Sequence, residues 1–370
     1  MQYRTFGNTD LKLPIIIFIV SALNLMNTVS AQELIPFAHF EKEMVIGLSI
    51  NSQDRVFVSF PNYDGNGNLA LAEEKNGKIT AYPTLSWNTK GNYKNSFLRV
   101  QDIFVDAKDN LWVLDSKPAA SGNIFADGSS NDKGLFKLVK INTQTNQVEK
   151  VYSFKNLDFS KSALNDVRID LKNNVAYLSD PAQAAIVILD LNTDEARTVL
   201  VNTKFTKADN ISLNYDGVEM KDKNGKPFSS NVNGIALTDD FKYFYFKPIN
   251  KRELFRIETR YLADKNLSEE ALESKVETVA KVGVTHGLIA DKKGNIYLTT
   301  SESHSISYLT PKGELKVLVK DKRLHWPDSL GIGSDGFLYF SDSQLQRLPQ
   351  WNNGVDKTEY PYTAYKIALP

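Results

Sequence analysis

The sequence contains no cysteine and no excess of either charge, and both absences narrow its chemistry. Without cysteine in 370 residues, disulfides, thiolate nucleophiles and cysteine-ligated zinc are excluded. Lys plus Arg and Asp plus Glu both number 44, so bulk charge predicts neither a nucleic-acid partner nor an anionic membrane surface. A P-loop, a G-x-S-x-G nucleophile elbow and an H-E-x-x-H zinc motif are also missing. The partner that we expect is therefore a small-molecule ligand, recognised by a local site.

The N-terminal region carries an apolar run that is short for a membrane span. The run covers residues 13–23, follows Arg4 and Lys12, and precedes the small residues of 29–31. A span needs about 18–20 apolar residues, whereas this order of features is typical of a secretory signal. We predict a signal peptide over 1–31 and one domain over 32–370, with the mature protein secreted or periplasmic and free of the membrane. An uncleaved anchor helix is the alternative.

The first 14 residues precede this signal and are unusual there. The segment "MQYRTFGNTDLKLP" (1–14) resembles the opening of bacterial aldo-keto reductases. Nothing further along the chain resembles the barrel of that family. We interpret residues 1–14 as an extraneous start, either an over-long beginning or a fused fragment, and assign no activity to them.

One pattern recurs six times along the chain. Each copy has a first segment with apolar residues two apart, a turn of small polar residues, and a second segment with a large ring. Period two indicates a β-strand, and the turn chemistry suits tight hairpins. The copies start 42 to 68 residues apart, which fits one four-stranded antiparallel sheet for each copy. The six copies are "IGLSINSQDRVFVSFP" (46–61), "QDIFVDAKDNLWVLDS" (101–116), "NDVRIDLKNNVAYLSD" (165–180), "NGIALTDDFKYFYFKP" (233–248), "HGLIADKKGNIYLTTS" (286–301) and "DSLGIGSDGFLYFSDS" (328–343).

The repeat predicts an all-β fold, a six-bladed β-propeller of four-stranded antiparallel blades. Segment 362–369 is the expected third strand of the last blade and 33–41 its outer strand, so the two chain ends should meet in one sheet. A short helix is expected at 267–276, capped by Ser268. The recurring ring predicts packing between neighbouring sheets. Its six members are Phe57, Trp112, Tyr177, Tyr245, Tyr297 and Tyr339.

Several of these segments resemble the major royal jelly and insect yellow protein family. They include "VQDIFVDAKDNLWVLDS" (100–116), "AYLSDP" (176–181), "NGIALTDD" (233–240) and "WPDSLGIGSDGFLYFSDSQLQRL" (326–348). The chain lacks the cysteines that insect members carry, so it is most similar to a bacterial, yellow-like member. The resemblance implies a six-bladed propeller with a ligand site at one end of its channel. Some members bind small aromatic amines, others are related to dopachrome tautomerase activity, and others have no established enzymatic role.

The first residue of each copy is a candidate for the channel site. In a propeller the first strand of each blade lines the channel, so these residues should face its mouth. Five of the six are polar, whereas a channel filled by apolar packing alone would not need polar residues at these positions. Hydrogen bonding to channel water and to one another is the structural alternative. The residues are Ile46, Gln101, Asn165, Asn233, His286 and Asp328.

A metal at this ring is a further possibility that the sequence leaves open. Propellers of the gluconolactonase and regucalcin type are distantly similar, and they hold a divalent cation with one Glu, two Asn and one Asp. Asn165 and Asn233 stand in the matching motifs, and Asp328 supplies a carboxylate. Ile46 and His286 occupy positions of the acidic ligands, which removes most of the attraction for calcium.

For catalysis the sequence offers one pair, His286 with Asp328, on successive inner strands. An imidazole and a carboxylate in contact can move protons in a tautomerisation or a lactone opening. Trp326 and Phe97 lie nearest to inner strands and are the candidates for stacking on a ligand ring. We therefore expect the ligand-binding set to be Gln101, Asn165, Asn233, His304, Trp326 and Phe97.

These features leave three functions open. The first is a secreted propeller of the yellow type that binds an aromatic amine or an oxidised catechol, with or without a dopachrome-type isomerase activity. The second is a metal-dependent lactonase. The third is a non-catalytic interaction scaffold. Neither the natural ligand nor the oligomeric state follows from the sequence.

Overall fold

The computed structural model describes residues 3–5, 12–14, 33–61, 69–119 and 134–370, in two units divided after Gln32. In the first unit, β1 (Tyr3–Thr5) pairs antiparallel with β2 (Lys12–Pro14). Residues 15–32, which hold the cleavage site and most of the apolar run of the predicted signal peptide, lie outside the described residues. Among the described residues, no helix has both the length and the apolar character needed to cross a membrane.

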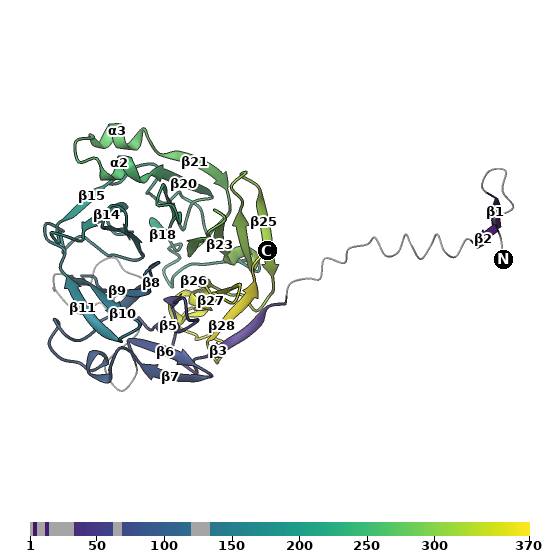
Figure 1. The fold of residues 1–370 in the computed structure, drawn as a ribbon, viewed down its shortest axis with the longest axis horizontal. Helices are drawn as coiled ribbons and strands as arrows, with labels where there is room; N and C mark the ends of the chain where they lie inside the picture. Colours follow the sequence, from purple (N-terminus) through teal and green to yellow (C-terminus); the bar gives the residue numbers. More distant parts are fainter. Residues whose placement is uncertain (1–2, 6–11, 15–32, 62–68, 120–133) are drawn as a thin grey trace. The chain divides into compact units, whose positions relative to one another are not determined.

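The second unit is a ring of antiparallel sheets, six of four strands each in the part described (Figure 1). The first three blades are β4 (Leu48–Ile50), β5 (Val56–Ser59), β6 (Leu71–Lys75) and β7 (Lys78–Ala81); β8 (Val100–Val105), β9 (Asn110–Lys117), β10 (Leu135–Asn142) and β11 (Gln147–Tyr152); β12 (Val167–Asp170), β13 (Val175–Asp180), β14 (Ala185–Asp190) and β15 (Ala196–Val199).

The next three blades complete the ring. They are β18 (Val232–Leu237), β19 (Tyr243–Pro248), β20 (Glu253–Glu258) and β21 (Glu277–Lys281); β22 (Leu288–Ala290), β23 (Ile296–Thr300), β24 (Ser305–Leu309) and β25 (Leu315–Lys320); β26 (Pro327–Ile332), β27 (Phe337–Asp342), β28 (Thr363–Ala368) and β3 (Ile35–His39). The predicted six-bladed β-propeller is confirmed.

The last blade joins the two ends of the propeller. β28 pairs with β3 in the register Thr363↔His39, and the Phe40 N–H donates to the Tyr362 carbonyl at 2.9 Å. The two ends of the propeller domain therefore meet in one sheet, as the sequence predicted. This sheet closes the ring without leaving the first or last blade incomplete.

The recurring ring is buried in each of the six blades, and in four of them it also binds the turn of its own hairpin. Within the described blades, four rings bond the Asp of the turn: Trp112 to Asp106 at 2.8 Å, Tyr177 to Asp170 at 3.3 Å, Tyr297 to Asp291 at 3.1 Å and Tyr339 to Asp335 at 2.7 Å. The ring packs against apolar neighbours while its polar atom satisfies a turn carboxylate. The second, third, fifth and sixth blades therefore share the same packing and hydrogen-bonding arrangement.

Two glycines allow the inner strands to approach closely at the axis. A Cβ on Gly234 would lie 2.2 Å from the His286 carbonyl oxygen, and one on Gly287 would lie 1.9 Å from that of Asp328. Both contacts join successive blades, so any side chain at these positions would force the inner strands apart.

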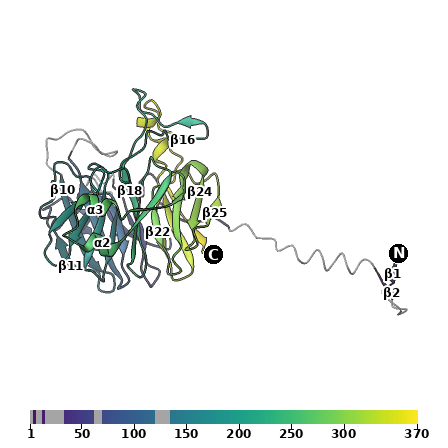
Figure 2. The same ribbon diagram turned by 90° about the horizontal axis from the view of Figure 1, so that it is seen from above.

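Helices and small hairpins lie between strands. α2 (Thr259–Ala263) and α3 (Glu269–Glu273) separate β20 from β21, and the Ser268 hydroxyl accepts the Ala271 N–H at the start of α3, which confirms the predicted helix and cap. β16 (Asn214–Tyr215) and β17 (Val218–Glu219) form a hairpin that projects from one end of the ring (Figure 2). The 3-10 turns are η1 (Leu85–Asn88), η2 (Ser301–Ser303), η3 (Leu345–Arg347) and η4 (Pro349–Trp351).

Candidate functional site

Polar side chains at the starts of two neighbouring inner strands, in the second and third blades, form a hydrogen-bonded chain. Gln101 Nε2 donates to Asn165 Oδ1 at 3.2 Å, and Asn165 Nδ2 donates to Asp166 Oδ1 at 2.7 Å. Asn233 is buried at the start of β18, and Ile46 belongs to an apolar cluster of the first and last blades. The structure thus joins two predicted binding residues, Gln101 and Asn165, and adds Asp166 to them.

Arg168 crosses the channel below this amide chain. Its guanidinium donates to Asp102 at 3.1 Å in the second blade and to the Leu288 carbonyl at 3.0 Å in the fifth. The Phe104 ring lies 5.3 Å from the guanidinium carbon. These contacts hold the Arg168 guanidinium between the second and fifth blades.

Two carboxyl groups near Arg168 have raised pKa values. Burial, followed by repulsion from Asp102, raises the pKa of Asp166 well above its usual range. The same two causes raise the pKa of Asp328 to about 7. Both residues are only partly buried, and Asp328, with a pKa of about 7, is available for proton exchange near neutral pH.

His286 is held as a neutral imidazole. Its side chain is buried, and its Nε2 lies 2.6 Å from the Ser301 hydroxyl, which in turn lies 2.9 Å from the Tyr215 hydroxyl. Burial, and secondarily the Lys247 charge, holds the pKa of His286 well below its usual range. Its Nδ1 has no hydrogen-bond partner among the described residues.

Trp326 connects His286 with Asp328. The indole stacks on the imidazole, with ring centres 3.8 Å apart and an interplanar angle of 20°, and its side chain also hydrogen-bonds to the Asp328 carboxylate. The predicted pair therefore lies around one indole ring. Trp326 thus contacts both members of the pair, His286 by stacking and Asp328 by a hydrogen bond.

Loop residues close over Trp326 at the channel mouth. Tyr215 and Phe228 each lie 5.7 Å from it between ring centres, and Trp351 packs on Phe228 at 5.5 Å. Trp326 is consequently only 1% exposed. Phe97 is also buried, but it packs on Trp87 between the first two blades and lies apart from this group.

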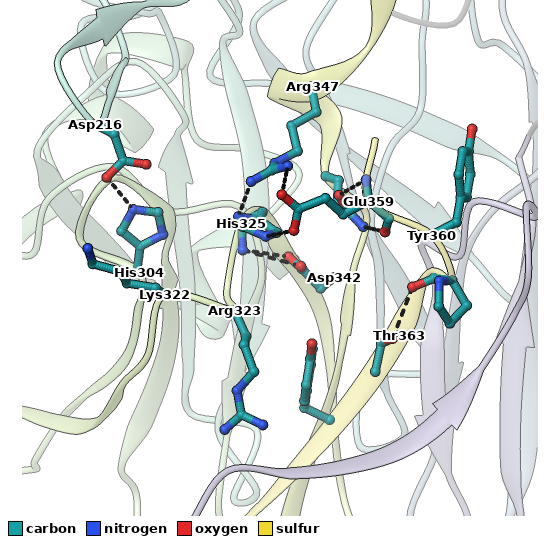
Figure 3. A pocket seen from close by; sticks show the side chains of 13 residues that line it. Asp216, His304, Lys322, Arg323, His325, Asp342, Arg347, Glu359, Tyr360 and Thr363 are labelled. Carbon is teal, nitrogen blue, oxygen red and sulfur yellow. Dashed lines mark hydrogen bonds and ion pairs between the residues drawn. The ribbon is translucent and has the colours of Figure 1, made fainter. Parts of the chain in front are cut away.

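A polar pocket of about 630 Å³ lies at the same end of the molecule, where loops of the last two blades meet (Figure 3). We call it the rim pocket. Its lining comes from the β16–β17 hairpin, the segment before β26, the end of β27 and the segment that leads into β28. The residues on which its chemistry depends are Asp216, His304, His325, Asp342, Arg347 and Glu359.

Both histidines of the rim pocket contact carboxylates. His304 Nε2 lies 3.0 Å from Asp216, and His325 Nε2 lies 3.5 Å from Glu359, which Arg347 also binds at 2.6 Å. Burial, then repulsion by Arg347, lowers the pKa of His325 to about 4. His325 is therefore a neutral base at pH 7, beside an ionised carboxylate.

Asp342 links the rim pocket to Trp326. Its buried carboxylate accepts the backbone N–H groups of His325, at 3.1 Å, and Trp326, at 2.5 Å. Burial raises its pKa to about 7. The sequence analysis did not select Asp342, Arg347 or Glu359, although the Asp at the end of a second strand recurs as Asp115 and Asp180.

The channel residues fit a divalent cation poorly. The Asn165 amide oxygen accepts from Gln101, and the apolar Ile46 side chain offers no ligand atom. Arg168 adds positive charge beside Asp102. Among the described residues, no group of three or more His, Asp or Glu side chains is placed to hold a metal ion. A calcium site built on Asn165, Asn233 and Asp328 would therefore lack charge.

The fold is shared with several solved propellers. A gluconolactonase of Xanthomonas campestris is 11% identical, with 93% of each chain covered and a TM-score of 0.53. Regucalcin of Agrobacterium tumefaciens, a calcium-binding protein, is 10% identical over 90% of this chain and 95% of its own, with a TM-score of 0.52. Virginiamycin B lyase of Staphylococcus aureus is 13% identical over 91% of this chain and 99% of its own, with a TM-score of 0.50. At these identities the likeness concerns the fold alone.

The chain thus shares the six-bladed propeller fold of these proteins. Residues 98–369 match the sequence model of a protein family described as "Major royal jelly protein". The chain belongs to the major royal jelly protein family, as its motifs indicated. A comparison with the sequences of curated proteins finds no significant match.

Proposed function

We propose that this protein is an exported propeller that binds a small aromatic ligand, an amine or an oxidised catechol, in the rim pocket. The observation that carries the proposal is the convergence of two histidines, three carboxyl groups and two tyrosines on one cavity of about 630 Å³. Sites for small molecules commonly have this volume and a few convergent polar groups. Membership of the major royal jelly protein family is consistent with it.

The acidic side of the pocket suits an ammonium group. Hydrogen bonding to His304 lowers the pKa of Asp216, and hydrogen bonding to Arg347 lowers the pKa of Glu359, so both are ionised at neutral pH. Their side chains are 73% and 67% exposed and are reachable by a ligand. Tyr360, 47% exposed, offers a ring for stacking or for a cation–π contact.

An isomerase activity is chemically consistent with the same residues. The neutral His325 is a base, and Asp342, with a pKa of about 7, is partly protonated at neutral pH. A base and an acid of this kind can remove a proton from a ligand carbon and return one to a ligand oxygen. Such a tautomerisation is redox-neutral and needs no cofactor. Lys322 lines the pocket near Asp216 and would attract a ligand carboxylate.

Calorimetric titration with dopamine and serotonin tests amine binding. We expect Glu359→Gln and Tyr360→Ala each to weaken binding by about 5- to 10-fold, since each removes one charged or aromatic contact. Tyr261→Ala, on α2 and outside the pocket, is the control and should bind as the unmodified protein does. Absence of heat with both amines would refute amine binding.

The isomerase version is tested by the spectroscopic decay of dopachrome. His325→Gln should slow the decay by about 10²–10⁴-fold if His325 is the base. The lactonase alternative makes a different forecast, since its activity should depend on a divalent cation. Lactone hydrolysis that is lost with EDTA and with Asn233→Ala would replace our proposal. A protein inactive in all of these assays would be better described as an interaction scaffold.

Export is the remaining part of the proposal. It rests on the order of basic residues, a short apolar run and small residues before Gln32. N-terminal sequencing of the protein recovered from the periplasm or medium should begin at Gln32. Recovery of the full chain in the cytoplasm alone would contradict export.

A further inference from the structure

The end of the channel opposite the rim pocket holds a separate cavity of about 620 Å³. It lies where the inner strands end and their hairpin turns meet, and we call it the funnel. Each inner strand contributes an apolar side chain, most of them partly exposed within the cavity. These six residues are Ile50, Val105, Ile169, Leu237, Ile289 and Ile332.

An apolar collar of this kind is unusual for surface that faces water. Phe104 of β8 adds a ring to it, and Phe241 and Leu369 extend it beyond the inner strands. Partly exposed isoleucine and leucine side chains gain stability when a ligand removes them from water. The size and the predominantly apolar lining are those of a small-molecule site.

Arg168 forms the closed inner end of the funnel and lacks one acceptor. Its two terminal nitrogens bind Asp102, at 3.1 Å, and the Leu288 carbonyl, at 3.0 Å. Its Nε–H is buried without a hydrogen-bond partner among the described residues, and the side chain is only 7% exposed. A buried N–H without an acceptor is costly, so an oxygen supplied by a ligand would be favourable here.

The charges around the funnel favour a neutral ligand. The Arg168 charge is already balanced by Asp102, and an ammonium group at the inner end would be repelled by the guanidinium. At the outer end, the acidic side chains of the lining outnumber its two lysines, Lys292 and Lys293. An anion entering the funnel therefore passes a net negative opening. The acidic side chains there are Asp106, Asp109, Asp239 and Asp291.

We infer that the funnel is a second binding site, for a neutral apolar molecule that carries one acceptor oxygen, such as a ketone, an alcohol or an ester. The apolar part of the ligand lies along the apolar collar, and the ligand oxygen accepts the Arg168 Nε–H. Arg168 closes the channel between this site and the rim pocket, so the two sites take different ligands.

The test compares 2-decanone, decanoate and decylamine by ligand-observed NMR and calorimetry on the purified protein. We expect 2-decanone to bind at least about 10-fold more tightly than either charged analogue, the equivalent of one favourable hydrogen bond or charge contact. Ile289→Trp, which fills the funnel, and Arg168→Lys, which removes the Nε–H, should each weaken 2-decanone binding by about 10-fold or more. Leu315→Trp, on the exposed face of β25, is the control and should bind normally.

Circular dichroism verifies that each variant is folded, and Ile332→Trp replaces Ile289→Trp if the latter is not. The inference is overturned if 2-decanone does not bind, if decanoate binds more tightly, or if the filled funnel retains full affinity. Retained affinity in Arg168→Lys would overturn the role of its Nε–H. Amine binding at the rim pocket is measured separately, so its failure and the failure of the funnel site are distinguishable.

Discussion

The second and sixth blades carry an aspartate at the same place, and its surroundings differ. Asp115, at the end of the LWVLDS segment, accepts the N–H groups of Leu98 and Arg99, as Asp342 accepts those of His325 and Trp326. In the second blade the buried Lys137 lies 2.9 Å from Asp115. In the sixth, the residue paired with Asp342 on the next strand is Thr363.

This difference shows that the residues around one repeated aspartate decide whether its carboxylate forms an ion pair or lines a pocket. An aspartate that binds two backbone N–H groups fixes the segment before the next inner strand in both blades. With a lysine beside it, the carboxylate is part of a buried ion pair. Without one, Asp342 lines the rim pocket and burial raises its pKa to about 7. In the sixth blade, where Thr363 stands in place of the lysine, the repeated aspartate lines a pocket and has a raised pKa.

The largest effect is expected from breaking the pair of the second blade. Lys137→Met should lower the free energy of unfolding by about 3–5 kcal/mol, because it leaves Asp115 buried without its cation. Lys140→Met on the same strand is the control: its ion pair with Glu149 is exposed and should contribute about 0–1 kcal/mol. Chemical denaturation measures both, and equal losses would show that the burial of Lys137 has no special role.

The next largest effect concerns pH. Asp342 has a folded pKa of about 7, above its unfolded value, so its protonation stabilises the fold at low pH and this contribution is lost as pH rises from about 4 to about 7. Asp342→Asn should remove about 2–4 kcal/mol of that pH dependence. The expected result is a flatter plot of unfolding free energy against pH. An unchanged slope would place the pKa of Asp342 near its ordinary value.

His325 should produce a change of the opposite sign. Its folded pKa of about 4 lies below the unfolded value, so the unfolded chain binds the extra proton first, and stability falls as pH is lowered from about 6.5 to about 4. His325→Gln should remove about 1–3 kcal/mol of this acid-side loss. The measurement is urea denaturation at several pH values. A steeper loss in the variant would contradict a neutral, buried imidazole.

The smallest effect is expected from making the sixth blade like the second. Thr363→Lys places an ammonium group opposite Asp342 and should change stability at pH 7 by less than about 1 kcal/mol, since pairing offsets the cost of burial. It should nevertheless lower the pKa of Asp342 and flatten the pH dependence. Thr363→Met is the control and should retain the slope. Identical slopes in Thr363→Lys and the unmodified protein would show that the missing lysine is not the cause.

The sequence predicted the blades well because each repeats the same physical device. Alternating apolar residues, a polar turn and a ring such as Trp112 are local signals, and they located every inner hairpin. The closing sheet also followed, since 33–41 and 362–369 were the apolar segments left without a partner blade.

The candidate site was less predictable because it depends on contacts between distant segments. Nothing in the sequence places Tyr215 and Phe228 over Trp326, or Arg168 between Asp102 and Leu288. Asp342 was visible as a repeated Asp, but its chemistry depends on Thr363 across the sheet. The roles of His286, Asp328 and the other selected residues stay predictions.

The sheet that joins β28 to β3 has a consequence for the order in which the propeller assembles. The bond between His39 and Thr363 spans 324 positions of the chain, so β3 emerges from the ribosome long before its partner exists. Until the last strand is made, β3 is an unpaired edge, the kind of segment that aggregates. Because the final pairing brings together the most distant parts of the ring, it should be the slow step of folding and, once formed, a latch against unravelling from either end.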